Sequence, residues 1–280
     1  METNLTNYHC HTVFCDGRVG METMIRFAIA KRFTSLGFSS HAPLPFQTPW
    51  TINKSDMSDY FAEFRRFKNK YKDKIDLYLG LEIDYLNDKY NPSNEYFKNL
   101  PLDFRIGSVH LLPDINENIV DIDCSVQRFH NLVNKNFNNN INLVIRLYFY
   151  NSIHMVKSGG FDIVGHCDKM LYNVERVCPG KTSEEWISQL LSDYFGLIAK
   201  NGYMVEINTK RYLEQKVFSP DEKYFTTLYD LGIPVVVNSD AHYPNKINDG
   251  RKEALFALKK AGYTTVRQLY NGKWVDVAIG

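Results

Sequence analysis

The sequence has no long apolar run and almost no net charge. No apolar stretch among its 280 residues approaches the roughly 18 residues of a membrane span. The opening segment METNLTNYHCHT lacks the basic and apolar regions of a secretory signal. The formal net charge is only +1 at pH 7. This disfavours binding of long nucleic acids, because such binding relies on a basic protein surface. We therefore expect neither a membrane protein nor a nucleic-acid-binding protein; the oligomeric state stays open.

Cysteine is scarce, and no stretch rich in proline, glycine and serine separates one part of the chain from another. The five cysteines are odd in number and scattered, at positions 10, 15, 124, 167 and 178. They fit reduced thiols in the cytoplasm better than a disulfide framework. With 44% hydrophobic residues the chain can bury a sizeable core. We expect one domain over residues 1–280.

What the sequence does contain is an alternation of short apolar runs and amphipathic segments. Strands are predicted over residues 5–12, 35–42, 76–86, 104–112, 161–169, 203–210 and 233–242. Helices are predicted over 21–33, 54–71, 125–157 with an Asn-rich turn in its middle, 183–202, 221–232 and 250–262. Residues 263–280 read as a short hairpin or a strand turned at Asn271-Gly272. Seven βα units in one domain predict an α/β fold with a seven-stranded barrel.

Residues of the metal-binding type fall at or just past the C-terminal ends of the predicted strands. In a βα barrel these ends converge at one mouth. His9 and His11 would share one face of their strand, since alternate residues point the same way, and Cys10 would point away as a packed thiol. Taken singly, each residue is more often part of the core or the surface; together they predict a metal site. The set is His9, His11, Asp16, His41, Glu82, His110, His166, Asp240 and His242.

The number and the chemistry of these candidate ligands bound the metal content. Nine ligands exceed what one ion takes, so two or three ions fit better, and imidazole with carboxylate suits Zn, Fe or Mn. Two further histidines, His130 and His154, lie on a predicted helix and serve as controls. Cys167, beside His166, is expected to be a packed thiol like Cys10.

These motifs resemble the polymerase-and-histidinol-phosphatase (PHP) family, most closely its monofunctional histidinol-phosphatase branch. The resemblance is carried by HCH with Asp16-Gly17, SSHAPLPF (39–46), GLEIDY (80–85), IGSVH (106–110), FDIVGH (161–166), EINTK (206–210) and NSDAH (238–242). It implies a distorted, TIM-like seven-stranded barrel with three divalent metal ions. It also implies hydrolysis of L-histidinol phosphate to L-histidinol and phosphate in histidine biosynthesis.

The resemblance also implies how the ligands are shared. One ion would take His9, His11, Glu82 and Asp240. A second would take Glu82, His110 and His166, so that Glu82 bridges the two. A third would take Asp16, His41 and His242.

The expected reaction is attack of a metal-activated hydroxide on the phosphorus atom of a small phosphate ester. Glu82, Asp240 and His242 are the predicted catalytic residues, and Asp240 or His242 would route a proton to the leaving alkoxide. Lys210 and Arg211 are predicted to bind the substrate phosphate, because a planar guanidinium suits phosphate, and His41 is predicted to contact substrate as well. Solvated loop charges are the alternative. Other candidates are Lys169 for the phosphate, with a solvated loop charge favoured for it, Phe46 and Asp84 for the organic group, and the loop HAPLPF as a cover over the mouth.

Three departures from the family pattern keep other functions open. Arg105 precedes IGSVH where an apolar residue is expected, Cys167 and Lys169 follow His166, and EINTKRY is an atypical loop. The alternative is a PHP-type phosphoesterase that acts on a different small phosphate ester or nucleotide. A non-catalytic binding module is the second alternative, but a degraded site would have lost ligands.

Overall fold

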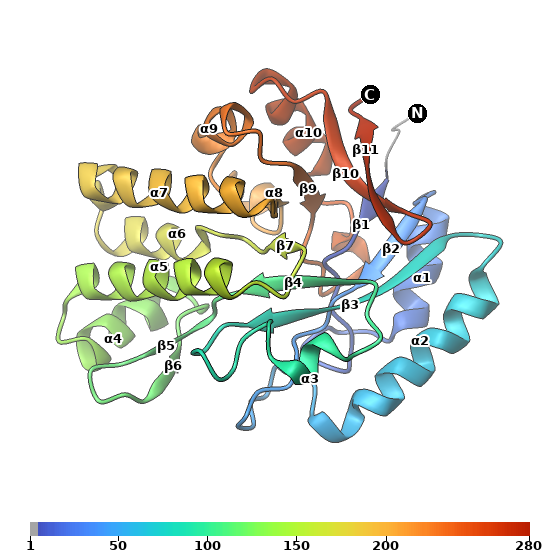
Figure 1. Ribbon diagram of the computed structural model, residues 1–280, viewed down its shortest axis with the longest axis horizontal. Coiled ribbons are helices and arrows are strands. Elements are labelled where there is room, and N and C mark those ends of the chain that lie inside the picture. Colours follow the sequence, from blue (N-terminus) through green and yellow to red (C-terminus); the bar gives the residue numbers. More distant parts are fainter. Residues whose placement is uncertain (1–4) are drawn as a thin grey trace.

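The computed structural model describes residues 5–280 and contains a seven-stranded parallel sheet. The strands of the sheet are neighbours in chain order, and the hairpin strands β5 and β6 lie outside the sheet (Figure 1). The seven strands are β1 Thr6–Asn7, β2 Ser35–Phe38, β3 Asp76–Asp84, β4 Phe104–Ser108, β7 Ile163–Val164, β8 Met204–Asn208 and β9 Val235–Asn238.

The first and last strands meet and nearly close the sheet into a barrel. Cys10 and Ala241 form an isolated parallel bridge. The His11 amide donates to the Ala241 carbonyl at 2.9 Å, and the Ala241 amide donates to the His9 carbonyl at 3.0 Å. Below this bridge, side chains join the strands: Asn7 Nδ2 donates to Ser239 Oγ at 2.7 Å. The predicted seven-stranded α/β barrel is confirmed.

Helices connect the strands and cover the barrel from outside (Figure 1). The long segment predicted over 125–157 forms two helices, separated at Asn138 and Asn139, which take positive φ angles of 50° and 57°. Between residues 5 and 280 no helix is both long enough and apolar enough to cross a membrane. The α-helices are α1 Met21–Ala30, α2 Met57–Tyr71, α3 Glu95–Lys98, α4 Val126–Asn136, α5 Ile141–Ser158, α6 Lys169–Val177, α7 Glu185–Asn201, α8 Tyr212–Gln215, α9 Phe225–Asp230 and α10 Arg251–Lys260.

Several elements differ from the sequence prediction. The first strand is shorter than predicted, because its ladder with β2 ends at Asn7 and His9 and His11 follow beyond it. The predicted fourth strand ends at Ser108, and a small hairpin follows it, made of β5 Leu111–Pro113 and β6 Ile119–Asp121. The short helices α3, α6 and α8 were not predicted. The C-terminal hairpin is confirmed as β10 Thr265–Tyr270 and β11 Lys273–Ala278.

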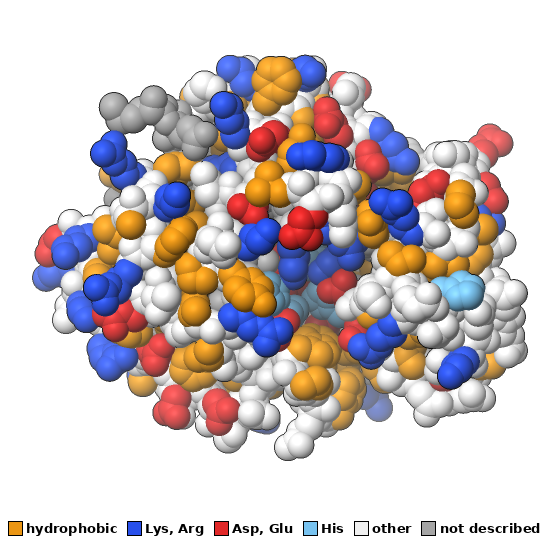
Figure 2. All heavy atoms as spheres, turned by 180° about the vertical axis from the view of Figure 1, so that it is seen from behind, with side chains coloured by type: hydrophobic (Ala, Val, Ile, Leu, Met, Phe, Trp, Pro, Cys, Tyr) orange, Lys and Arg blue, Asp and Glu red, His pale blue; other side chains and the backbone are white. Residues whose placement is uncertain are grey.

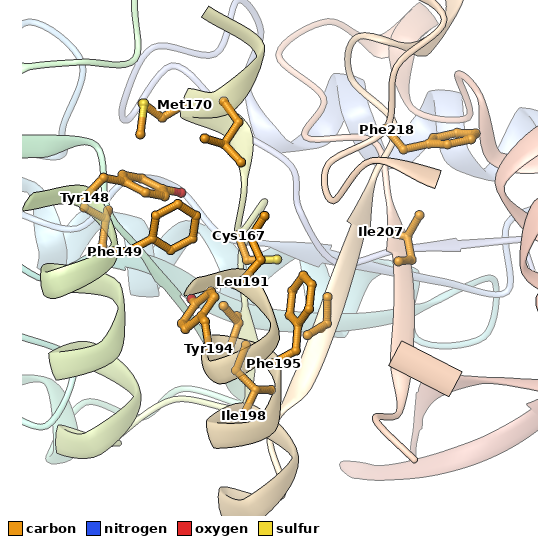
Figure 3. Close-up of a cluster of buried hydrophobic side chains, with 14 of the residues drawn as sticks. Tyr148, Phe149, Cys167, Met170, Leu191, Tyr194, Phe195, Ile198, Ile207 and Phe218 are labelled. Carbon is orange, nitrogen blue, oxygen red and sulfur yellow. The ribbon is translucent and has the colours of Figure 1, made fainter. Parts of the chain in front are cut away.

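The largest core cluster lies between helices α5, α6 and α7 and the strands β7 and β8. Figure 3 shows Tyr148 and Phe149 of α5 near Tyr194 and Phe195 of α7, with Cys167 pointing into the cluster. Phe149 and Tyr194 meet edge to face, with ring centroids 5.7 Å apart. Cys167 is 1% exposed and Cys10 is 0% exposed, so both are packed thiols as predicted.

The C-terminal hairpin closes the end of the barrel at which the strands begin. The inner cluster contains Tyr8, Phe104 and Leu269, and Trp274 of β11 packs against it. The Leu269 amide donates to the Tyr8 hydroxyl at 2.9 Å. A side chain at Gly80 would come within 2.6 Å of the Phe104 ring, so the glycine is what lets Phe104 fill the interior.

Arg105, which departs from the family pattern, has a structural role far from the strand ends at the mouth. Its Nη2 donates to the carbonyls of Phe97 and Leu100, both at 3.0 Å, and to that of Lys98 at 3.3 Å. These carbonyls belong to the end of α3 and the turn after it, where helical partners run out. The guanidinium therefore fastens α3 to β4.

We expect Arg105→Leu to lower the free energy of unfolding by about 1–3 kcal/mol, because three carbonyls lose a charged donor. Urea denaturation would measure the change. Arg105→Lys keeps the positive charge but lacks the planar guanidinium, so its free energy of unfolding should lie between those of the native protein and Arg105→Leu. An unchanged unfolding free energy in Arg105→Leu would show that water replaces the guanidinium at no cost.

Candidate metal centre

Glu82, at the end of β3, lies at the centre of a buried cluster of imidazoles. Its side chain is 1% exposed. Its Oε1 lies 2.8 Å from His166 Nε2 and 3.3 Å from His110 Nε2. Its Oε2 lies 3.0 Å from His9 Nε2 and 3.0 Å from His41 Nδ1. Four imidazoles from four different strand ends therefore surround one carboxylate.

A second part of the cluster is built around Asp240 and Asp16. Asp240 Oδ1 lies 3.1 Å from His11 Nε2 and 3.4 Å from His242 Nδ1. Asp16 Oδ2 lies 3.0 Å from His242 Nε2. The structure thus brings together all nine residues that the strand-end pattern selected. Figure 2 shows histidine side chains at the bottom of a hollow, with acidic and basic side chains around it.

The backbone around the cluster is shaped for this convergence. A side chain at Gly17 would come within 2.4 Å of the backbone of His11 and Thr12, so only glycine lets the loop that carries Asp16 fold back onto them. Asp240 has a φ of 48° and His166 a φ of 21°. Residues other than glycine hold such angles at a cost of about 1–3 kcal/mol each, and they cluster at functional sites.

The cluster fits divalent metal ions. His11 Nε2, His41 Nδ1 and Asp16 Oδ1 are buried and have no hydrogen-bond partner within residues 5–280. His41 Nδ1 lies close to Glu82, but without the alignment of a hydrogen bond. Unpaired buried polar atoms are costly, and coordination of a cation would satisfy them. The ligand atoms fall into overlapping groups within 4.8 Å of one another, such as His9–His11–Glu82, Glu82–His110–His166 and His11–Asp16–His41–His242.

Two buried carboxylates orient imidazoles of the cluster from behind. Glu206 Oε1 lies 2.7 Å from His9 Nδ1, and Asp84 Oδ1 lies 3.0 Å from His110 Nδ1. In both histidines this leaves Nε2 facing Glu82, which is how outer carboxylates prepare metal-binding histidines. The prediction that Asp84 contacts the organic group of a substrate is therefore wrong: it is 3% exposed and holds His110.

The ionisation of the cluster matches this geometry. Burial opposes charge on Glu82, but the surrounding histidines, His9 first, hold its pKa well below the usual range. Burial likewise opposes the ionisation of Asp240, whose pKa is held low by Lys210 and His9. Burial lowers the pKa of His11 well below 6.5 and that of His41 to about 4. Both carboxylates are thus ionised at neutral pH, and both imidazoles are free to bind a cation.

Three basic side chains line the side of the cluster formed by the ends of β7 and β8. Lys210 Nζ lies 3.1 Å from Asp240 Oδ1. Lys169 Nζ lies 2.6 Å from Asp123 Oδ2 and 3.8 Å from Asp240 Oδ2. The side chain of Lys169 is only 12% exposed, so the favoured alternative of a solvated loop charge is wrong for it. Arg211 Nη2 lies 3.8 Å from Asp123 Oδ1, and Arg211 Nη1 donates to the Lys169 carbonyl.

Some neighbours of the cluster were missed in the sequence. Glu206 carried a readable signal, because it interrupts the apolar run YMVEIN and shares a strand face with Asn208. Asp123 and Trp50 carried none, since they lie in irregular segments. Trp50 stands at the mouth, with its ring 4.8 Å from that of His41. Phe46, which was predicted to contact the organic group of the substrate, is 39% exposed and lines an outer groove beside α4.

The two control histidines lie apart from the cluster. His130 is exposed on α4, and His154 lies on α5, where its ring packs on that of Tyr150. Neither belongs to a group of potential metal ligands among the described residues.

We expect Glu206→Gln to weaken zinc binding by about 10- to 100-fold, because the amide cannot provide the charge that fixes His9. Competition with a chromophoric chelator measures this affinity without reference to activity. Asp162→Asn is the matched control, since Asp162 accepts a backbone N–H at the opposite end of β7. Equal zinc affinity in Glu206→Gln and the native protein would remove Glu206 from the site.

The chain is similar to known proteins along most of its length. The family model of the PHP domain matches residues 7–210. The probable histidinol-phosphatase of Deinococcus radiodurans is 24% identical over 280 aligned positions, which cover 94% of this chain and 96% of that protein. The histidinol-phosphatase of Bacillus subtilis is 26% identical, with 84% of this chain and 92% of that protein covered.

Solved structures share the fold. A Listeria monocytogenes protein assigned as a histidinol phosphatase superposes with a TM-score of 0.78 at 21% identity, covering 89% of this chain and 99% of that one. The histidinol phosphate phosphatase of Lactococcus lactis superposes with a TM-score of 0.72 at 19% identity, covering 97% and 99%, and its crystal structure contains zinc, L-histidinol and phosphate.

Proposed function

The chain belongs to the PHP domain family, and from this we propose that it is a metal-dependent phosphomonoesterase that hydrolyses L-histidinol phosphate to L-histidinol and phosphate in histidine biosynthesis. One observation carries the proposal: Glu82 is surrounded by imidazoles that arrive from four strand ends, and buried nitrogens of His41 and of the neighbouring His11 have no hydrogen-bond partner within residues 5–280. The proposal is supported by a probable histidinol-phosphatase that aligns with 94% of the chain and by a histidinol-phosphatase that aligns with 84% of it. Because the barrel joins strands from both ends of the chain, we treat residues 1–280 as one catalytic domain.

We propose three divalent ions, of Zn, Fe or Mn, in this cluster. His9, His11, Glu82 and Asp240 would hold the first, Glu82, His110 and His166 the second, and Asp16, His41 and His242 the third. The overlapping ligand groups support this division, because each proposed set shares at least three members with one of them. Bound divalent ions supply a hydroxide nucleophile at neutral pH and neutralise the charge on phosphate.

The residues of the chain itself would bind and orient the phosphate. Lys210 and Arg211 carry positive charge beside the cluster, and Lys169 adds a third cation on the same side. Their present partners, Asp240 and Asp123, hold these groups at the mouth until a phosphate competes for them. The fork of Arg211 suits two phosphate oxygens.

Proton transfer would fall to the residues at the far side of the cluster. The low pKa of Asp240, set by Lys210 and His9 against the effect of burial, keeps this carboxylate ionised, so it holds no proton to donate at neutral pH. His242 Nδ1 lies 3.0 Å from the Asp240 carbonyl oxygen and Nε2 faces Asp16, so its ring is fixed at the mouth. We propose Glu82, Asp240 and His242 as the catalytic residues and His41, at the rim, as a further contact to substrate.

A kinetic panel of phosphate monoesters on metal-replete protein tests the proposal. We expect kcat/KM for L-histidinol phosphate to exceed that for sugar phosphates, nucleotides and aryl phosphates by about 100-fold or more, since a missing polar contact in a specific site is expensive. Equal kcat/KM values across the panel would contradict the substrate assignment and indicate a phosphoesterase that does not prefer L-histidinol phosphate. No hydrolysis of any ester, despite bound metal, would leave a binding module.

A further inference from the structure

A small open pocket lies at the mouth beside His41 and His110. Its volume is about 140 Å³, and it is lined by Asp16, His41, Trp50, His110, Asp121 and Asp123. No lysine or arginine is among these lining residues. The basic side chains Lys169, Lys210 and Arg211 instead border a separate cavity beyond His166 and Asn208. The mouth therefore has a basic side and an acidic side.

Trp50 supplies an aromatic wall of this pocket. It lies in the loop after β2, and its ring stands edge-on to His41 at 4.8 Å and to His110 at 5.9 Å. A part of the side chain stays accessible. An indole in such a position can stack on a flat heterocycle or bind a cation over its face.

The two carboxylates of the acidic side are not equally neutralised. Asp123 is tightly paired with Lys169, at 2.6 Å. Within residues 5–280 the one ion pair of Asp121 is with Arg128 Nη2, at 3.8 Å, on a side chain that is 64% exposed. The side chain of Asp121 is itself only 20% exposed. The charge of such a carboxylate is compensated only in part by the exposed guanidinium, and a cationic ligand would stabilise it further.

We propose that this pocket is the subsite for the organic group of the substrate, and that it selects a positively charged amino alcohol with an aromatic ring. The inference rests on the proposed function, because it assumes that the phosphate lies on the cluster beside the basic side chains. Asp121 would receive the ammonium group and Trp50 would pack on the ring.

Electrostatics gives the physical reason for such a subsite. A phosphate site made of cations repels an ammonium group on the same molecule, so the substrate gains from a carboxylate near its charged end. A neutral ester gains nothing from Asp121, and a leaving group with negative charge is repelled by it. The pocket would thus separate L-histidinol phosphate from sugar phosphates and nucleotides by charge.

Two substrates and three variants test the subsite. The readout is the ratio of kcat/KM for L-histidinol phosphate to kcat/KM for p-nitrophenyl phosphate, measured on metal-replete protein. We expect this ratio to fall by about 10- to 100-fold in Asp121→Asn and by about 10-fold in Trp50→Ala. Glu117→Gln is the control, because Glu117 is an exposed carboxylate in the turn of the same β5–β6 hairpin. Its ratio should equal that of the native protein.

A ratio within about twofold of the native value in both Asp121→Asn and Trp50→Ala overturns the subsite, since a structural or metal-binding defect would slow both substrates alike. L-Phenylalaninol phosphate keeps the ammonium group but not the imidazole. It therefore distinguishes failure of the proposed function from failure of the proposed subsite. If the native protein prefers it to L-histidinol phosphate, the proposed function fails, and the subsite is still supported if Asp121→Asn lowers its kcat/KM relative to p-nitrophenyl phosphate. If no amino-alcohol phosphate is preferred to p-nitrophenyl phosphate, the subsite is overturned.

Discussion

Glu82→Gln is expected to lower kcat for L-histidinol phosphate by at least about 10³-fold and to reduce the bound metal. Loss of a single donor to a transition state costs about 10²- to 10³-fold, and Glu82 faces four imidazoles of the cluster at once. The glutamine is nearly isosteric, but its amide nitrogen would point at a metal or an imidazole nitrogen where an oxygen is needed. Steady-state kinetics and metal content by mass spectrometry measure the two effects.

A control and a second variant keep this result interpretable. Glu22→Gln is the control, because Glu22 also accepts bonds from two side chains, Lys70 and Tyr71, but lies on α1 away from the mouth. His9→Ala is a second probe of the same centre and should also abolish hydrolysis. Near-native kcat in either Glu82→Gln or His9→Ala, with the metal content unchanged, would exclude that residue from the centre.

Removal of metal by a chelator is expected to abolish hydrolysis and to lower Tm by about 8 °C or more. Ions present at about 1,000 times their Kd stabilise a fold by about 4 kcal/mol, and for a chain of this size each kcal/mol moves Tm by about 2–4 °C. Differential scanning fluorimetry and an activity assay, before and after addition of zinc or manganese, measure both changes. Full activity after exhaustive chelation would contradict a metal-dependent reaction.

The difference in Tm between the metal-loaded and the metal-free protein should widen as the pH rises from 6.5 to 9. Burial alone would lower the pKa of His110, but Asp84 and Glu82 raise it to about 9. A histidine with a raised pKa stabilises the fold fully below the ordinary value of 6.5, and this contribution is lost as the pH rises through its folded value. His9 shifts in the same direction, because Glu206 and Glu82 outweigh burial. A difference that stays constant over this range would show that these imidazoles are not protonated in the metal-free protein.

The barrel and its mouth could be predicted because both depend on patterns that are local in sequence. Apolar runs mark the strands, and in a parallel barrel every strand end points to the same mouth, so position alone assigned Glu82 and His166 to one place. The strand-end pattern selected the right residues even where the predicted strand bounds were wrong. His9 and His11 lie beyond β1, but the bridge at Cys10 keeps the chain extended and both imidazoles on the same side.

What could not be predicted depends on contacts between irregular segments. Trp50 and Asp121 line one pocket at the mouth although neither belongs to a predicted element, since the β5–β6 hairpin is only three residues long on each side. Asp84 and Glu82 lie two residues apart on one strand face. The position of His110 distinguishes their roles, because Asp84 contacts its Nδ1 from behind whereas Glu82 faces its Nε2 inside the cluster. The order of strands says nothing about which loops fold over them.

The seam between β1 and β9 has a consequence for how the protein is made. Asn7 and Ser239, which meet there, are 232 residues apart, and Tyr8 finds its partner Leu269 after 261 residues. A ribosome therefore exposes His9 and His11 long before it has synthesised the aspartate and histidine that complete their surroundings. Because the last of the seven strands is synthesised near the end of translation, closure of the barrel has to wait for contacts of high sequence separation, which form slowly.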